Sequence, residues 1–242
     1  MSAVSSSRRR FMQATVAGAV TLPALRSEEV AAASSAGGGE PGARRATVAE
    51  VQGYLFLQPA EADFVEALVD HMVPADALSP SGTGVGINTY FDRALGGEWG
   101  RGSRLYLAGP WAPGVPSQGY QLPLTPAELF RAGSAALARH LDGQFGKPFS
   151  ALDADQKEQV LRELESGQLA VESGPPSHEY FRLLYQLVVE GLFADPIYGG
   201  NVNKAGWNMI GFPGVIAVHA DDVVRFRDRP YVAQPAGIAD VS

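Results

Sequence analysis

Residues 177–201 read SHEYFRLLYQLVVEGLFADPIYGGN, a stretch that carries the strongest helix pattern and the most specific turn of the chain. Apolar side chains recur at helical spacing through its first half, namely Phe181, Leu184, Tyr185, Val188, Val189 and Leu192. Ser177 is expected to cap this helix, because its hydroxyl can accept a hydrogen bond from a backbone amide of the first turn. The second half, from Asp195 to Asn201, combines proline, glycine and asparagine, which favour a sharply turned backbone. The stretch therefore predicts an amphipathic helix that ends in a defined turn.

Four further segments repeat apolar residues with the same period, at residues 59–73, 87–95, 126–145 and 154–166. Thr125 and Glu128 form a capping box before the third of these, whose end is expected near Gly146. Asp153 is expected to cap the fourth. No run alternates polar and apolar residues as a half-buried strand does. We therefore predict an all-α fold, a single compact bundle of about five helices with long loops rich in glycine, proline and aromatic residues.

Two irregular segments depart from this helical pattern. The first lies between Gly96 and Pro123 and holds the aromatic residues Trp99, Tyr106, Trp111 and Tyr120. A loop of this length is either functional or disordered, and its large rings argue for contact with the chain itself or with a partner. The second spans residues 195–214, where we expect a short helix from about Asn203 to Ile210, capped by Asn203 and ended by Gly211.

The N-terminus carries the pattern of an export signal. Arg8, Arg9 and Phe11 precede an uncharged run from Ala14 to Leu25, which is the order of a twin-arginine signal. The run is shorter than the roughly 20 apolar residues that a membrane-spanning helix needs. We expect a signal peptide over residues 1–33, a flexible linker over 34–58, a helical domain over 59–219 and an extended tail over 220–242. The twin-arginine route carries folded proteins, so the cargo is expected to fold before it is exported.

The amino-acid composition excludes several kinds of chemical site in this chain. The 242 residues contain no cysteine, which excludes disulfides, thiolate metal ligands and Cys-ligated iron–sulfur clusters. The four histidines include no pair at helical metal-ligand spacing, and no nucleotide-binding or nucleophile motif is present. The net charge of −7 disfavours a nucleic-acid partner. We therefore predict no catalytic, cofactor-binding or metal-binding residues in this chain.

Several short motifs follow one another in a fixed order along the chain: Met72–Asp76, Tyr106–Pro110, Leu124–Glu128, Glu190–Asn201, Gly206-Trp207 and Gly211–Gly214. This order resembles the gluconate 2-dehydrogenase subunit 3 family. The most specific of them is Asp-Pro-x-Tyr-Gly-Gly-Asn, which begins at Asp195. The resemblance runs from about Pro59 to Val218 and leaves out the tail.

The resemblance implies a non-catalytic small subunit of a membrane-associated, FAD-dependent sugar or polyol dehydrogenase. In that family a GMC-type flavoprotein subunit binds FAD and oxidises CH–OH groups of sugars or sugar acids, and a cytochrome c subunit with haem c often passes the electrons to quinone. The small subunit assists maturation of the flavoprotein and its export by the twin-arginine translocase. The resemblance therefore implies a periplasmic location, peripheral to the inner membrane, and no cofactor on this chain. Substrate specificity is expected to reside in the flavoprotein.

A partner interface is the site hypothesis for this chain. Its candidate residues are Trp111, Asp195, Pro196, Tyr198, Gly199, Gly200, Asn201, Trp207 and Phe212. Tyr198 and Trp207 are the expected anchors, because rigid aromatic side chains dominate many interfaces. The alternative is a turn that packs internally and closes the bundle. For the whole chain, the competing hypotheses are a stand-alone periplasmic enzyme and a solute-binding protein, and the latter is disfavoured because alternating strand–helix units are missing.

Overall fold

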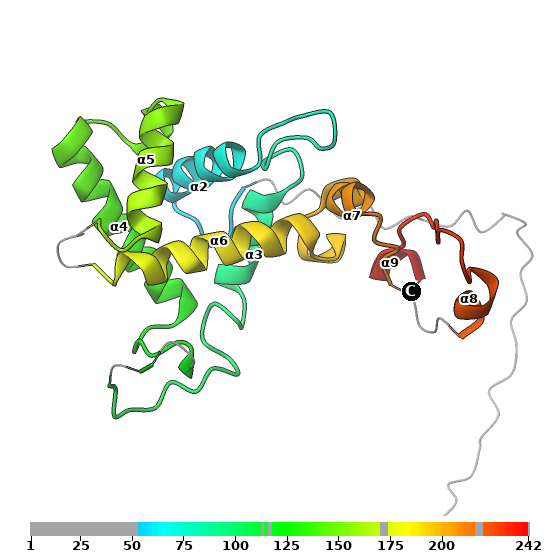
Figure 1. The fold of residues 1–242 in the computed structure, drawn as a ribbon. Coiled ribbons are helices and arrows are strands. Elements are labelled where there is room, and N and C mark those ends of the chain that lie inside the picture. Colours follow the sequence, from blue (N-terminus) through cyan, green and yellow to red (C-terminus); the bar gives the residue numbers. More distant parts are fainter. Residues whose placement is uncertain (1–52, 113, 116–117, 170–173, 216–219, 242) are drawn as a thin grey trace, which may run out of the picture. The chain divides into compact units, whose positions relative to one another are not determined.

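The computed structural model describes residues 53–112, 114–115, 118–169, 174–215 and 220–241. Over these residues the chain is helical and forms no β-strand, apart from one isolated bridge between Gly214 and Ala236 (Figure 1). The prediction of an all-α fold is confirmed. The signal residues Arg8, Arg9 and Phe11 lie outside the described residues, as does the linker up to residue 52.

The five helices that the sequence predicts all form. They are α2 (Pro59–Met72), α3 (Ile87–Gly96), α4 (Pro126–Phe145), α5 (Ala154–Glu165) and α6 (Ser177–Phe193). Shorter elements join or follow them: the 3-10 turns η2 (Phe149–Ala151), η3 (Pro196–Tyr198) and η4 (Val202–Lys204), and the helices α7 (Ala205–Ile210), α8 (Ala220–Arg225) and α9 (Ile238–Val241).

The helix ends follow their capping residues in most cases. Thr125 and Glu128 form the predicted capping box, since the Glu128 carboxylate accepts the Thr125 backbone N–H at 2.8 Å. Asp153 caps α5 by accepting the Gln156 N–H at 2.9 Å. Gly146, in the left-handed region, ends α4.

Two predicted caps are wrong. Ser177 is buried and already helical, and the residue before it, Pro176, is the N-cap of α6. Asn203 lies within η4 with a φ of 56°, and Lys204 precedes α7. In both places the surrounding fold decides where the helix starts, whereas the capping preference of Ser and Asn is a local property. The predicted end of α7 at Gly211 is confirmed.

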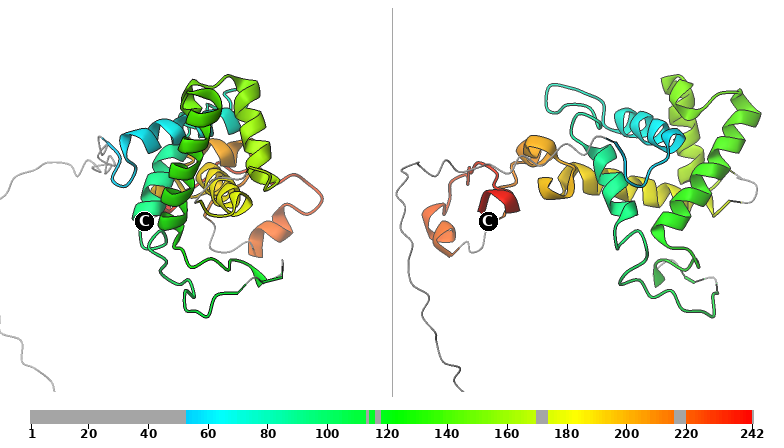
Figure 2. Two further views of the ribbon diagram at one scale, coloured as in Figure 1. Left: turned by 90° about the vertical axis from the view of Figure 1, so that its left-hand side faces the viewer. Right: turned by 180° about the vertical axis from the view of Figure 1, so that it is seen from behind.

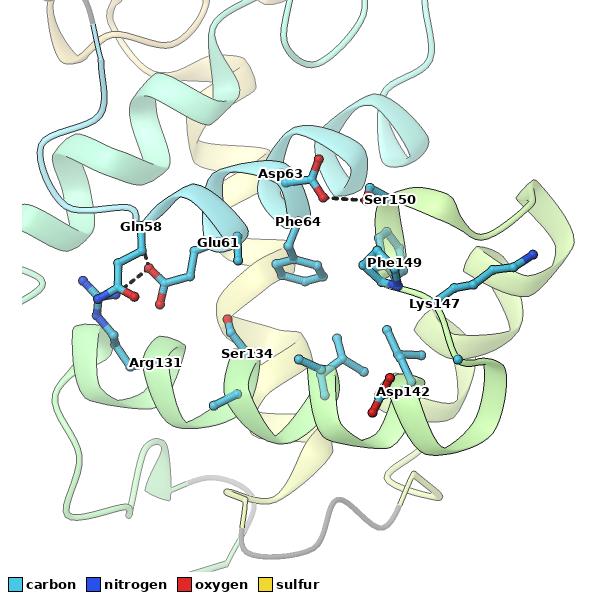
Figure 3. Close-up of a pocket in the computed structure, with 17 residues that line it drawn as sticks. Gln58, Glu61, Asp63, Phe64, Arg131, Ser134, Asp142, Lys147, Phe149 and Ser150 are labelled. Carbon is cyan, nitrogen blue, oxygen red and sulfur yellow. Dashed lines mark hydrogen bonds and ion pairs between the residues drawn. The ribbon is translucent and has the colours of Figure 1, made fainter.

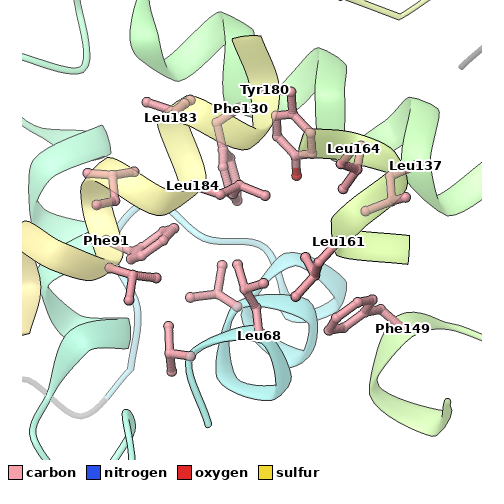
Figure 4. Close-up of a cluster of buried hydrophobic side chains, with 14 of the residues drawn as sticks. Leu68, Phe91, Phe130, Leu137, Phe149, Leu161, Leu164, Tyr180, Leu183 and Leu184 are labelled. Atoms are coloured by element: carbon pink, nitrogen blue, oxygen red, sulfur yellow. The ribbon is translucent and has the colours of Figure 1, made fainter. Parts of the chain in front are cut away.

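Helix α6 is the centre of the bundle. It packs against α3, α4 and α5, while α2 packs against α3 and η2 (Figures 1 and 2). The core between them is formed by large apolar side chains, including Leu68, Phe91, Phe130, Leu137, Leu164, Tyr180 and Leu184 (Figure 4). Full burial of each such side chain stabilises the fold by about 1.5–3 kcal/mol.

A glycine in α4 allows α6 to approach closely. A Cβ atom placed on Gly133 would lie only 2.2 Å from the Tyr180 ring. The ring is fully buried, and its hydroxyl is 2.7 Å from the Ser134 Oγ. Burial raises the pKa of this hydroxyl above its usual value, so it remains protonated and acts as a structural group.

A buried carboxylate fixes the segment that leads into α2. Asp92 on α3 accepts the backbone N–H groups of Leu55, Phe56 and Leu57 at 2.8, 2.7 and 2.9 Å. Three such hydrogen bonds compensate a charge that would otherwise be costly to bury. The Asp92 carboxylate therefore has a structural role, in which it joins α3 to the segment before α2.

Candidate partner interface

The segment after α6 folds back on the bundle through the Asp-Pro-x-Tyr-Gly-Gly-Asn motif. The Asp195 carboxylate accepts the Ile197 N–H at 3.0 Å, and Pro196 begins η3. Both residues therefore shape the turn itself.

The two glycines of the motif permit two close contacts. A Cβ on Gly200 would lie 2.1 Å from the Gly191 carbonyl oxygen, so this glycine lets the segment lie directly on α6. Gly199 has a φ of +99°, and a Cβ there would lie 2.8 Å from the Nη1 atom of Arg93 on α3. The motif is thus fitted against two helices of the core.

Two buried side chains, Asn201 and Trp207, form hydrogen bonds that fix the backbone of the segment. Asn201 is fully buried; its Nδ2 donates to the Ala194 carbonyl at 2.9 Å, and its Oδ1 accepts the Gly206 N–H at 2.8 Å. The Trp207 ring is only 4% exposed, and its Nε1 donates to the Phe193 carbonyl at 2.7 Å. These two side chains bind the segment to the end of α6.

The same segment exposes several apolar side chains. They are Ile197, Tyr198, Val202, Met209, Ile210, Phe212 and Val215. Tyr198 is 56% and Ile210 is 58% exposed. The Phe212 ring lies against the inner Trp207 ring with centroids 5.3 Å apart and an angle of 71°, so a buried residue supports an exposed one. An apolar surface on a rigidly held backbone is typical of a protein-binding site.

The C-terminal tail returns to this segment, a contact that the sequence did not indicate. Val215 N–H donates to the Ala236 carbonyl at 2.7 Å, and Ala236 N–H donates to the Pro213 carbonyl at 3.1 Å. The Ile238 N–H donates to the Asp195 carboxylate at 2.8 Å. Asp195 therefore organises both the start of the segment and the returning tail.

The long loop before α4 presents a second aromatic site. The Tyr120 hydroxyl donates to the Leu124 carbonyl at 2.7 Å, and the Trp99 ring is half-buried against the core. Trp111 is 39% and Tyr106 is 87% exposed. Trp99 and Tyr120 thus anchor the loop within the chain, and Trp111 and Tyr106 face outward.

A hollow of about 470 Å³ lies between α2, α4 and η2 (Figure 3). Phe64 and Phe149 meet edge to face within it, with ring centroids 5.3 Å apart. Its polar side chains are largely engaged with one another: Glu61 pairs with Arg131, and Asp63 accepts the Ser150 hydroxyl. The hollow is an apolar surface with a charged rim, and two of its carboxylates are engaged in these contacts.

Two partly buried tyrosines have raised pKa values. Burial raises the pKa of Tyr120 to about 12 and, together with a hydrogen bond to Glu66, that of Tyr54 to about 12, so both stay protonated at neutral pH. Within the described ranges, no cluster of three or more His, Asp or Glu side chains is placed to hold a metal ion. Nor is any helix in that part of the chain long and apolar enough to cross a bilayer.

A family model, gluconate 2-dehydrogenase subunit 3, matches residues 59–214. The chain belongs to this family. No curated protein and no solved structure matches the chain. The gluconate 2-dehydrogenase subunit 3 match begins at the first residue of α2 and ends at the Gly214 bridge, so it contains the whole bundle and the 195–214 segment. Membership makes the chain a subunit of a multi-subunit dehydrogenase complex.

The candidate interface residues of this subunit 3 chain fall into two groups. Six of them act within the chain, as the alternative of an internally packed turn expects: Asp195, Pro196, Gly199, Gly200, Asn201 and Trp207. Tyr198, Phe212 and Trp111 are exposed, as an interface requires. Contact of any of them with a partner stays a prediction. Sequence reasoning missed the outward-facing Ile197, Met209 and Ile210, whose exposure depends on how the segment packs.

Proposed function

We propose that this chain is the non-catalytic small subunit that binds the FAD-containing catalytic subunit of a sugar or polyol dehydrogenase, supports its folding and carries it through the twin-arginine route. The observation that carries the proposal is the apolar outer face of the 195–215 segment. It lies within the family match except for its last residue, and its backbone is fixed by buried hydrogen bonds.

The energetics support a protein partner for this face. Exposed apolar side chains gain about 25 cal/mol for each Å² removed from water, and a preformed surface avoids much of the entropy cost of ordering loops on binding. Tyr198 is the central aromatic candidate, and Ile210 lies on the neighbouring α7. Trp111 provides a further exposed ring on the loop before α4.

The export part of the proposal rests on the N-terminal sequence. Arg8, Arg9 and Phe11 precede the Ala14–Leu25 run, which matches a twin-arginine signal. Because this route accepts folded cargo, one signal can serve a complex assembled in the cytosol. The proposed complex would act on the periplasmic side of the inner membrane, where a cytochrome c subunit can accept electrons from the flavin.

Co-purification tests the interface. The tagged chain is co-expressed with the flavoprotein subunit as wild type and as Tyr198→Ser with Ile210→Ser. The double variant should keep its helical circular dichroism spectrum and lose the flavoprotein. Leu78→Ser is the matched control, because Leu78 is 69% exposed but lies on the loop after α2. Equal flavoprotein recovery with all three proteins would reject this surface as the interface.

Fractionation tests the shared signal. Replacing Arg8 and Arg9 together by lysine preserves charge but removes the twin-arginine pattern. Flavoprotein activity should then stay in the cytosolic fraction. Unchanged periplasmic activity in cells that carry this variant would show that the flavoprotein is exported independently.

A further inference from the structure

Arg93, on the last turn of α3, is half-buried and has no acidic partner within the described part of the chain. No ion pair joins Arg93 to the neighbouring Asp92 carboxylate, whose oxygens accept three backbone N–H groups. A half-buried arginine that lacks an acidic partner leaves its guanidinium available to a carboxylate from another molecule.

The surroundings of Arg93 are built to hold its side chain in place. The side chain lies across Gly199, where any Cβ would meet its Nη1 at 2.8 Å and its Cδ at 3.1 Å. Gly199 follows the exposed Tyr198 in the family motif. Arg93 thus connects the bundle to the candidate interface.

A hollow of about 290 Å³ opens beside this arginine. It is lined by Gly53, Tyr54, Leu55, Asn88, Thr89, Asp92 and Arg93. Leu55, at 76% exposure, gives it an apolar edge, and the Arg93 side chain lies against Gly199, the residue after Tyr198. The hollow has room for one side chain that enters beside Leu55 and Arg93.

We infer that Arg93 is the charged centre of the interface and binds a carboxylate side chain, Asp or Glu, of the flavoprotein subunit. A guanidinium can hold a carboxylate through two parallel hydrogen bonds, and arginine is enriched among the residues that dominate interfaces. The apolar edge from Leu55 would help to exclude water and strengthen the pair. This inference rests on the proposed function and adds a specificity-determining contact to it.

The test measures binding of the purified flavoprotein subunit to the immobilised full chain over a range of salt concentrations. Arg93→Gln should weaken binding about thirtyfold or more, and Arg93→Glu further, because the partner carboxylate is left without its cation. Salt should weaken wild-type binding more steeply than Arg93→Gln binding. The melting temperature of the isolated Arg93→Gln chain should stay within about 2 °C of wild type, since Arg93 has no pair to lose there.

Lys147→Glu is the matched control for charge. Lys147 is exposed beside η2, and this substitution changes the net charge by the same two units as Arg93→Glu. It should bind like the wild type. Wild-type affinity and salt dependence in Arg93→Gln would overturn the inference, as would a large fall in its melting temperature, which would indicate a role in the fold.

The two proposals fail in different ways. If the wild-type chain does not bind the flavoprotein at all, both the proposed function and the inference about Arg93 are refuted. If the wild type binds, the Tyr198 and Ile210 double variant does not, and both Arg93 variants bind normally, only the role of Arg93 is refuted.

Discussion

Replacing Asn201 by alanine should destabilise the chain more than the same change two residues later. Asn201 is fully buried in the left-handed region, with φ 49° and ψ 40°. Its amide joins the Ala194 carbonyl to the Gly206 N–H through bonds of 2.9 and 2.8 Å. Alanine cannot make either bond, and it tolerates the left-handed region less well than asparagine.

The magnitude follows from these contacts. A buried donor or acceptor that loses its partner costs about 1–3 kcal/mol, and the conformational change adds about 0.5–1 kcal/mol. Asn201→Ala should therefore lower the free energy of unfolding by about 3 kcal/mol. This total combines the two lost hydrogen bonds with the backbone contribution, and the loss of one bond alone would account for less than half of it. For a domain of this size the melting temperature should fall by about 6–12 °C.

Asn203→Ala separates the two contributions. Asn203 has a similar φ of 56°, but its side chain is exposed, so alanine should cost only the conformational part, about 0.5–1 kcal/mol. Thermal unfolding followed by circular dichroism measures both variants. Equal falls in melting temperature would refute the role assigned to the buried amide.

Three further effects concern stability. Gly133→Ala should lower the free energy of unfolding by about 2 kcal/mol because its Cβ would lie 2.2 Å from the Tyr180 ring. A Cβ at Gly143 in the same helix would have nothing within 4 Å, so Gly143→Ala should raise the free energy of unfolding by about 0.5–1 kcal/mol. Urea unfolding measures both variants, and a change of the same sign in both would contradict the packing. Hydrogen bonds from Thr125 hold the pKa of the Glu128 carboxyl below its usual value of 4.5. The stabilisation of the fold by this carboxylate is therefore present above pH 4.5 and is lost as the pH falls. Glu128→Gln keeps the cap, so its melting temperature should fall less steeply with falling pH than that of the wild type. Burial raises the pKa of Tyr54 from 10.0 to about 12, so the unfolded chain releases this proton at a lower pH than the folded chain does. The free energy of unfolding should therefore fall as the pH rises from 10 to 12. In Tyr54→Phe this fall should be less steep.

The helices could be predicted because their signals are local. The Thr125–Glu128 box and the glycine at 146 mark the ends of α4 through bonds between neighbouring residues. Ser177 and Asn203 misled the same reasoning, because their places were decided by packing with distant parts of the fold.

The site could be predicted only in part for the same physical reason. The motif at Asp195 was visible in the sequence, but its bond to Ile238 joins residues 43 apart. Trp207 looked like an interface anchor by residue type, yet its ring packs inward beneath Phe212. Among the described residues Arg93 has no acidic partner, although Asp92 is its neighbour in sequence, and no spacing rule reveals this because the Asp92 carboxylate binds a segment 36 residues away.

The central proposal is that this chain serves a catalytic partner and has no sugar-oxidising activity of its own. Dye-linked sugar oxidation in the periplasmic fraction tests it most directly, measured in cells that express the flavoprotein subunit alone, this chain alone, or both. Activity should appear only when both are present. Full activity from the flavoprotein alone, or any turnover from this chain alone, would contradict the account.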